Sequence, residues 1–134
     1  MDTVHILCTL RDVGSFIDVL PSDLLPHSIT LTSTVIVKAD PQTEVGSDKL
    51  AVHVRLKSSC AFYIDSYGIV PLVSSIQAFI KRNCRTWDYN RRQLQDLTGN
   101  VCDKYICLFA LYVDRTYDPK QFISLLNACN AAHR

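Results

Sequence analysis

Gln95 and Cys102 stand seven residues apart, in a stretch that passes through a turn and enters the strongly apolar segment Val101–Val113. A cysteine in the first turn of a helix is favoured as the nucleophilic thiolate, because the helix dipole stabilises negative charge there. Backbone N–H groups of the same turn bind a developing oxyanion, and the side-chain amide of Gln95 adds one more donor. The spacing predicts that Cys102 is a nucleophile, that Asn100 caps its helix, and that Gln95 stabilises an oxyanion.

A cysteine nucleophile needs a general base within reach, and a histidine oriented by an acid often supplies it. Asp65 ends a strand-like run upstream of this stretch. The turn-rich loop 40–48 contains no histidine, and Asp48 stands just before the next strand. A carboxylate is already ionised at neutral pH, so Asp48 cannot relay a proton as an imidazole does. Asp48 and Asp103 also disfavour a thiolate at Cys102 through charge repulsion.

Each of these residues also has a purely structural interpretation. Cys102 is then a small residue at a helix start, Gln95 an exposed polar residue, and Asp103 an acid that stabilises a helix N-terminus. Asp65, in the sequence Asp-Ser-Tyr-Gly, suits a turn because its side chain can bond to nearby backbone groups. His53 follows the missing base position by five residues, so strand alternation turns it to the opposite face. We expect it to be a partly exposed strand residue.

Hydrophobic periodicity predicts a single α+β domain over residues 1–134. The predicted strands are residues 33–39, 50–56, 60–64 and 86–89, the second and third joined as a hairpin through Lys57-Ser58-Ser59. The predicted helices are residues 3–15, 73–84 and 101–113, and a last one from Asp118-Pro119 whose buried side includes Phe122, Ile123 and Leu125. Alternation predicts that the strand 50–56 is half-buried. The helix 101–113 is apolar nearly all round, which predicts a place at the centre of the core.

Composition narrows the classes of function. The chain has 134 residues, of which 48% are hydrophobic, and a net charge of +1, which gives no strong signal for nucleic acid or an anionic membrane. The longest apolar run, Tyr105–Val113, has nine residues, whereas a spanning helix needs ~20. No N-terminal signal pattern is present, so we expect a soluble intracellular protein of the cytoplasm or nucleus. The scattered cysteines predict neither a disulfide framework nor a zinc site, and no cofactor is expected.

Several motifs recur in an order that resembles one family, the adenovirus-protease-like (adenain-like) cysteine peptidases, especially those carried by large virus-like DNA transposons. This family shares its fold with the SUMO-type deconjugating proteases. The resemblance covers most of the chain. It combines the Gln95-to-Cys102 spacing with five segments: Asp18–Pro26, Val35–Pro41, Phe62–Gly68, Ile80–Cys84 and Tyr89–Gln95. It implies a papain-like fold in which a small mixed sheet packs on a central buried helix. It also implies that Cys102, Asp65 and Gln95 occupy the family's site positions.

The sequence departs from the family at the base. By position, Asp48 replaces the catalytic histidine, Lys49 replaces the tryptophan after it, and Asp103 replaces the glycine after the nucleophile. The resemblance therefore leads to two hypotheses. The first is a pseudoprotease that holds a protein or peptide partner in the former substrate cleft. The second is an active endopeptidase that acts on viral precursors or ubiquitin-like conjugates with Cys102 as nucleophile and a non-standard base. A virion-associated location would also fit the resemblance. Whether any imidazole reaches Cys102 distinguishes the two.

Overall fold

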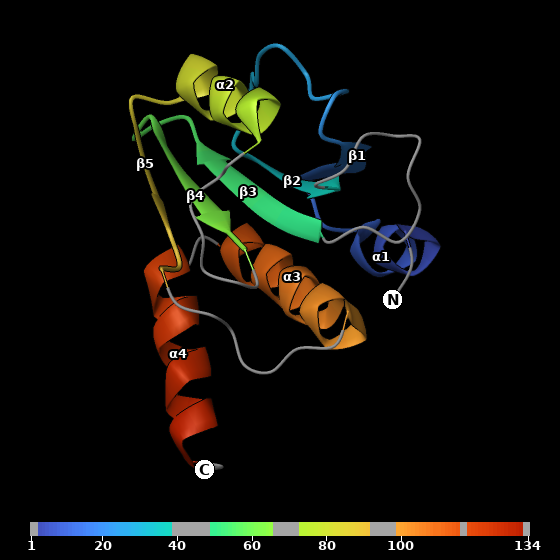
Figure 1. The fold of residues 1–134 in the computed structure, drawn as a ribbon, viewed down its shortest axis with the longest axis vertical. Helices are drawn as coiled ribbons and strands as arrows, with labels where there is room; N and C mark the ends of the chain where they lie inside the picture. The colour runs from blue at the N-terminus through green and yellow to red at the C-terminus, as the bar shows by residue number, and fades with distance from the viewer. Residues whose placement is uncertain (1–2, 39–48, 66–72, 92–98, 116–117, 133–134) are drawn as a thin grey trace.

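The computed structural model describes residues 3–38, 49–65, 73–91, 99–115 and 118–132. Over these residues the chain is an α+β domain in which five strands form one mixed sheet, accompanied by four helices (Figure 1). The predicted α+β class and mixed sheet are therefore confirmed. In chain order the elements are α1 (Thr3–Leu10), β1 (Phe16–Pro21), β2 (Ser33–Lys38), β3 (Lys49–Arg55), β4 (Cys60–Ile64), α2 (Ser74–Asn83), β5 (Thr86–Tyr89), α3 (Gly99–Asp114) and α4 (Pro119–Ala132).

The sheet has an antiparallel centre and parallel edges, in the order β1-β2-β3-β4-β5. β2, β3 and β4 pair antiparallel, which places Ala51 of β3 between Ile36 and Ile64. β1 runs parallel to β2, and β5 runs parallel to β4. The predicted hairpin joins β3 to β4, and Ser59 in its turn has a φ of 51°, in the left-handed region.

Helices cover both faces of the sheet, so the domain has two hydrophobic cores. In Figure 1, α2 lies on one side of the sheet and α3 on the other. The α2 side buries residues of alternate parity on β2, β3 and β4 together with helix residues: Val35, Val37, Leu50, Val52, Val54, Ala61, Tyr63, Ile76, Phe79, Ile80 and Cys84. The α3 side buries the others with α1, α3 and α4: Ile6, Leu10, Val19, Ile36, Ala51, Phe62, Ile64, Ile106, Cys107, Phe109, Ala110, Val113, Phe122 and Ile123.

Several burial predictions were wrong. β3 is buried on both faces, since Ala51 and Val52 point to opposite sides and neither is exposed to solvent. What alternates along this strand is the size and polarity of its side chains, not their exposure. The face with the small Ala51 is also buried, because α3 packs over it. α3 itself covers one face of the sheet and does not lie at the core's centre. Phe109 is fully buried, whereas its neighbour Leu108 is 50% exposed. On α4, Leu125 is also exposed.

The N-terminal region differs most from its prediction. The first helix ends at Leu10 and not at residue 15, and residues 16–21, which were not predicted as a strand, form the edge strand β1. This strand exists because β2 pairs with it, beginning where the Thr34 N–H donates to the Ser15 carbonyl at 2.7 Å. Locally it is a poor strand: Asp18 accepts a hydrogen bond from the N–H of Val19, and Pro21 is tolerated only because β1 is at an edge.

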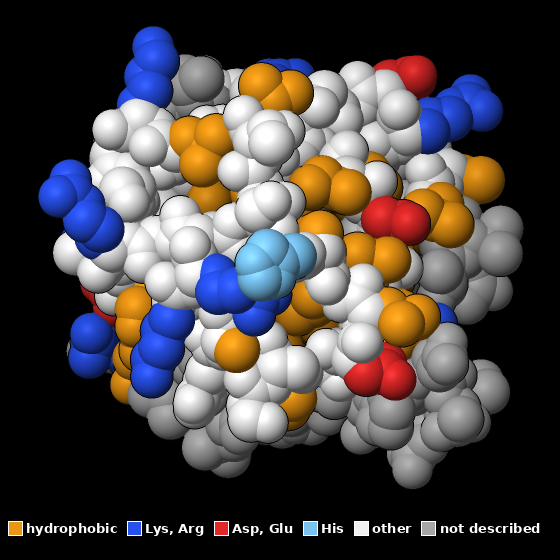
Figure 2. All heavy atoms as spheres, turned by 90° about the horizontal axis from the view of Figure 1, so that it is seen from above, with side chains coloured by type: hydrophobic (Ala, Val, Ile, Leu, Met, Phe, Trp, Pro, Cys, Tyr) orange, Lys and Arg blue, Asp and Glu red, His pale blue; other side chains and the backbone are white. Residues whose placement is uncertain are grey.

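The segment between β1 and β2 is tied to α2 by polar contacts. The side-chain oxygen of Asn83 accepts a hydrogen bond from the Ile29 N–H at 2.8 Å, and Arg82 donates to the His27 carbonyl at 2.9 Å. Figure 2 shows this side of the molecule, where Lys and Arg side chains stand apart from one another with hydrophobic side chains between them. Arg82, at the basic end of α2, therefore helps to hold the β1–β2 connection in place.

Candidate functional site

The helix that carries Cys102 begins earlier than predicted. α3 starts at Gly99, which makes Asn100 a residue of the first turn and not the cap, and makes Cys102 the fourth residue of the helix. The helical assignment around Cys102 agrees with the predicted helix. Its side chain, together with Asp48 and Gln95, lies outside what the structure describes. Of the predicted site residues, the structure thus describes the backbone of Cys102 and the surroundings of Asp65.

Asp65 is fixed by a side chain that sequence reasoning did not identify. Its backbone N–H donates to Oδ1 of Asn90 at 3.0 Å, and its carbonyl accepts from Nδ2 of Asn90 at 2.6 Å. Asn90 follows β5 and is only 5% exposed. The backbone pairing of β4 with β5 ends at Tyr63 and Tyr89, and the Asn90 side chain continues the contact between the two chain segments beyond it. The amide of Asn90 therefore sets where Asp65 leaves the sheet.

Asp65 and the start of β3 lie at the same end of the sheet. Ile64 pairs with Ala51, so Asp65, one residue further, is level with Leu50, the second residue of β3. α3 runs roughly along β3 (Figure 1). The last residue of α3, Asp114, accepts hydrogen bonds from the N–H and hydroxyl of Ser15, at the opposite end of the sheet. The first turn of α3 is consequently directed toward the end where β3 begins and β4 stops.

His53 is buried, which corrects the expectation of a partly exposed residue. It is 1% exposed, lies on the α3 side of the sheet, and meets the ring of Phe109 edge-on at a centroid distance of 6.5 Å. Its Nδ1 is 2.8 Å from the hydroxyl of Thr34, and its Nε2 accepts from Nε of Arg55 at 3.3 Å. The bond from Arg55 requires a lone pair on Nε2, so the ring proton is on Nδ1 and points to Thr34.

The electrostatics of His53 follow from these neighbours. Burial, and then the positive charge of Arg55, lower its pKa from 6.5 to about 4, although Asp114 acts in the opposite direction. The imidazole is therefore neutral at physiological pH. Phe109, its neighbour on α3, is seven residues beyond Cys102, which corresponds to about 10 Å along a helix axis. Thr34 and Arg55 already engage both ring nitrogens, so His53 is a packed structural histidine.

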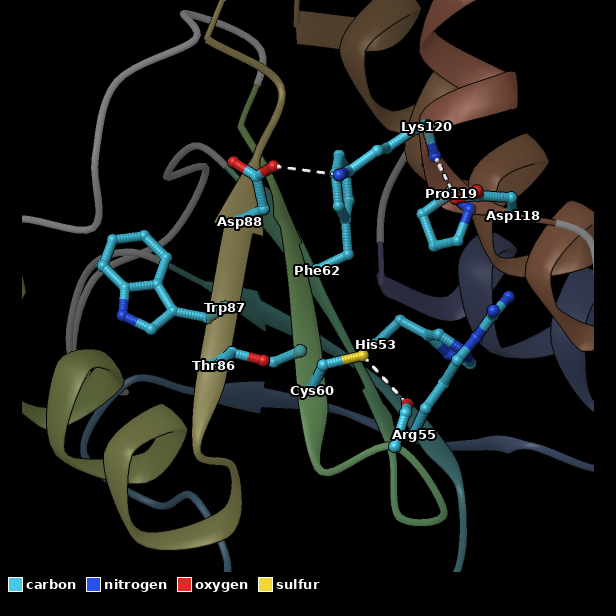
Figure 3. Close-up of a pocket in the computed structure, with 12 residues that line it drawn as sticks. His53, Arg55, Cys60, Phe62, Thr86, Trp87, Asp88, Asp118, Pro119 and Lys120 are labelled. Carbon is cyan, nitrogen blue, oxygen red and sulfur yellow. Dashed lines mark hydrogen bonds and ion pairs between the residues drawn. The ribbon is translucent and has the colours of Figure 1, made fainter.

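A groove opens on the α3 side of the sheet, at the end away from Asp65 (Figure 3). It has a volume of about 520 Å³, and sequence reasoning did not identify it. Its lining comes from the last part of β3, the hairpin turn, the first parts of β4 and β5, and the start of α4: His53, Arg55, Ser58, Cys60, Ala61, Phe62, Thr86, Trp87, Asp88, Asp118, Pro119 and Lys120. Figure 3 shows that the ring of Trp87 points away from Phe62 and Cys60, on the other side of β5.

Asp88 is the most strongly paired group of the groove. Its carboxylate accepts from Arg91 at 2.8 Å and lies 3.6 Å from the ammonium of Lys120. Partial burial alone raises its pKa, but the Tyr89 N–H and Arg91 outweigh that effect, so the pKa lies below its ordinary value. A second acid, Asp118, accepts the Lys120 backbone N–H at 2.9 Å and caps α4, which begins at Pro119 as predicted.

Two further observations concern the described residues. Among them, no three His, Cys, Asp or Glu side chains come together as a metal site. None of the described helices is long and apolar enough to cross a membrane. A comparison of the sequence with models of known protein families and with curated proteins gives no match.

The hydrogen bonds between Asn90 and Asp65 make a testable contribution to stability. Replacing Asn90 with alanine should lower the free energy of unfolding by about 1–3 kcal/mol, because two partly buried backbone groups lose a partner. Asn90→Asp keeps an acceptor for the Asp65 N–H and loses the donor to its carbonyl, so we expect an intermediate loss. Urea unfolding followed by circular dichroism measures both. Wild-type stability in both variants would show that Asn90 does not hold Asp65.

Proposed function

We propose that this chain is a cysteine-peptidase-like protein of the adenain-like fold that has lost peptidase activity and binds a protein or peptide partner. The motif order described above motivates the family. The arrangement of the described elements supports it: the helix that carries Cys102 directs its first turn toward the end of the sheet where β3 begins and Asp65 leaves β4. Asp48 immediately precedes β3 in the sequence. The partner would bind where this end of the sheet meets the first turn of α3.

The state of His53 is the observation that carries the proposal. A nucleophile needs its base within about 3 Å and with a pKa near the working pH. His53 has a pKa of about 4 and packs beside Phe109, well beyond the helical position of Cys102. Moving it would break its contacts with Thr34 and Arg55. It therefore does not replace the histidine that is missing at position 48.

The reactivity of Cys102 tests this proposal. We expect iodoacetamide, and a peptide vinyl sulfone directed at thiol proteases, to label Cys102 at neutral pH no faster than the exposed Cys8. Without a base, Cys102 is not converted efficiently to thiolate. Mass spectrometry of tryptic peptides measures both sites in one sample, so Cys8 serves as an internal reference.

A gain-of-function variant provides the second arm. Asp48→His restores an imidazole at the family's base position and removes a negative charge, so labelling of Cys102 by the vinyl sulfone should rise by roughly 10²-fold or more. Asp48→Asn removes the charge without adding a base and is the matched control. Fast, stoichiometric labelling of the wild-type protein would overturn the proposal and favour an active peptidase with a non-standard base.

A further inference from the structure

The five-stranded sheet has two edge strands, β1 and β5. Within the described part of the chain, each of them pairs with a neighbouring strand on one side only. An edge strand presents unpaired N–H and C=O groups, to which a strand of a second protein molecule can add. The outer sides of β1 and β5 therefore decide whether this sheet can grow, and the two are closed by different residues.

The outer side of β1 is closed by local hydrogen bonds and by a proline. Pro21 is compatible with a strand where its missing N–H would face away from the neighbouring strand. Since the N–H direction alternates along a strand, Val19 also faces outward. The Val19 N–H donates to Oδ1 of Asp18 at 2.7 Å, and the Phe16 N–H donates to the Val13 carbonyl at 3.1 Å. These outward positions thus offer no free N–H group to a second chain.

The outer side of β5 depends on a single aspartate. The Thr86 N–H donates to the Ser59 carbonyl at 3.3 Å, on the side of β4. Because the direction alternates, the N–H groups of Trp87 and Tyr89 point outward. The Tyr89 N–H donates to Oδ1 of Asp88 at 2.8 Å, whereas the Trp87 N–H has no partner among the described residues. Asp88 therefore reduces the outward donors of β5 from a pair to one.

The side chain of Arg91 lies across this edge and holds Asp88 in place. It donates to Oδ1 of Asp88 from Nη2 at 2.8 Å and from Nε at 3.2 Å, while its guanidinium lies 4.7 Å from the ring centroid of Tyr89. Asp88 borders the groove on the α3 side, and Tyr89 packs on the α2 side. Lys120 adds an ion pair from α4, at 3.6 Å from Oδ2 of Asp88 (Figure 3). A guanidinium that contacts side chains of both faces covers the edge between them.

The backbone at Arg91 supports a specific role for this contact. Its φ is 57°, in the left-handed region that residues other than glycine rarely adopt. Such a conformation costs free energy and persists where the surrounding contacts determine it. Here the chain turns directly after β5, and the side chain returns to Asp88 and Tyr89. The turn ends the strand and places the guanidinium on its outer side.

We propose that the Asp88–Arg91 pair closes the β5 edge of the sheet against a second copy of this chain. Without the pair, the outward groups of Trp87 and Tyr89 match those of a second, antiparallel β5. Trp87 of each copy would exchange both N–H···O bonds with Tyr89 of the other, and the two sheets would become one across a twofold axis. The inference goes beyond the proposed function, because it does not depend on the reactivity of Cys102.

The association state of Asp88 variants tests the proposal. Asp88→Ala removes the acceptor of the Tyr89 N–H and releases Arg91. Sedimentation velocity of the full chain at about 0.1 mM, a concentration at which exposed strand edges associate, should then show a dimer that the wild-type protein does not form. Asp88→Asn retains an acceptor oxygen, so we expect it to associate about tenfold more weakly than Asp88→Ala. An Asp88→Ala variant that associates no more than the wild-type protein would overturn the proposal, as would equal association of the two variants.

The other edge provides the matched control. Asp18→Ala removes the same kind of hydrogen bond from Val19, but Pro21 still leaves β1 without a second outward donor. It should therefore remain monomeric under the same conditions. Adding Trp87→Pro to Asp88→Ala removes the remaining outward N–H of β5, at a position where an edge strand tolerates proline, and should abolish the dimer. A dimer that forms equally in Asp18→Ala, or persists in the double variant, would contradict a contact through β5.

Amide hydrogen exchange of the wild-type protein tests the closed edge without any substitution. After correction for intrinsic rates, the Tyr89 N–H should exchange about tenfold more slowly than the Trp87 N–H, because only the former is hydrogen-bonded. This measurement remains decisive if Asp88→Ala does not fold. Equal rates at Trp87 and Tyr89 would show that Asp88 does not occupy the outward N–H group, and the proposal would be wrong.

Discussion

Replacing Phe109 with alanine should lower the free energy of unfolding by about 3–5 kcal/mol. Phe109 is fully buried where α3 meets the sheet and α4. Its ring centroid lies 6.0 Å from that of Phe62 and 5.6 Å from that of Phe122. Removing the ring leaves a cavity bounded by three structural elements, which cannot all collapse into it. Since small domains are typically stable by 5–15 kcal/mol, this loss would remove much of the stability.

The neighbouring residue provides a matched control. Leu108 is on the same helix and is 50% exposed, so Leu108→Ala should cost no more than about 1 kcal/mol. Urea unfolding of both variants, followed by circular dichroism, gives the two values directly. Similar losses for the two would mean that α3 does not present Phe109 to the sheet, and that the packing of this face is different from the one described.

Acidification from pH 7.5 to pH 4.5 should destabilise the protein through His53. The pKa of this residue is about 4 in the folded protein and 6.5 in an unfolded chain. Between these values the unfolded chain binds a proton that the folded protein does not, so stability falls as the pH decreases. Each unit of pKa difference corresponds to 1.36 kcal/mol, which gives a loss of about 3 kcal/mol on approaching pH 4. The contribution is fully present above pH 6.5.

Asp88 and Asp114 do not obscure this window. The pKa values of Asp88 and Asp114 lie below the ordinary value for aspartate, so their contributions are lost at lower pH than that of His53. Unfolding free energies at half-unit intervals from pH 7.5 to 4.5 give the slope. His53→Asn should flatten it, and His27→Gln, a change at an exposed histidine, should not. A slope that His53→Asn leaves unchanged would contradict the buried neutral state.

Local sequence patterns correctly predicted the strands and turns whose residue types strongly favour one structure. Strand β5 matches its predicted range of 86–89, and the hairpin of β3 and β4 follows from its alternation and short turn. β1 was missed because its pairing with β2 is non-local and its own sequence, with Asp18 and Pro21, is unfavourable for a strand. Exposure was also misjudged, because a sequence does not say which faces of a strand helices will cover.

The candidate site also combines features that the sequence predicts with features that depend on the tertiary structure. The spacing of Gln95 and Cys102 and the helix that follows are sequence features, and the helix is confirmed. Asn90 contacts Asp65 from 25 positions away, and His53 contacts Thr34 from 19 positions away. No local sequence pattern predicts contacts of this kind. The groove depends on α4 meeting β3, β4 and β5, which is a property of the tertiary arrangement. The sequence predicted only the helix start at Asp118 and Pro119, which are two of the residues that line the groove.

The order of elements also has a consequence for the nascent chain. β2, β3 and β4 leave the ribosome together, whereas α3, which covers their second face, is complete only about fifty residues after Ile64. At translation rates of about 5–20 residues per second, that interval lasts roughly 2–10 s. During this time Ile36, Phe62 and Ile64 face solvent on an unfinished sheet. A chaperone that recognises apolar strands would therefore be able to bind this face before residue 114 is synthesised. It would no longer be able to bind once α3 has docked.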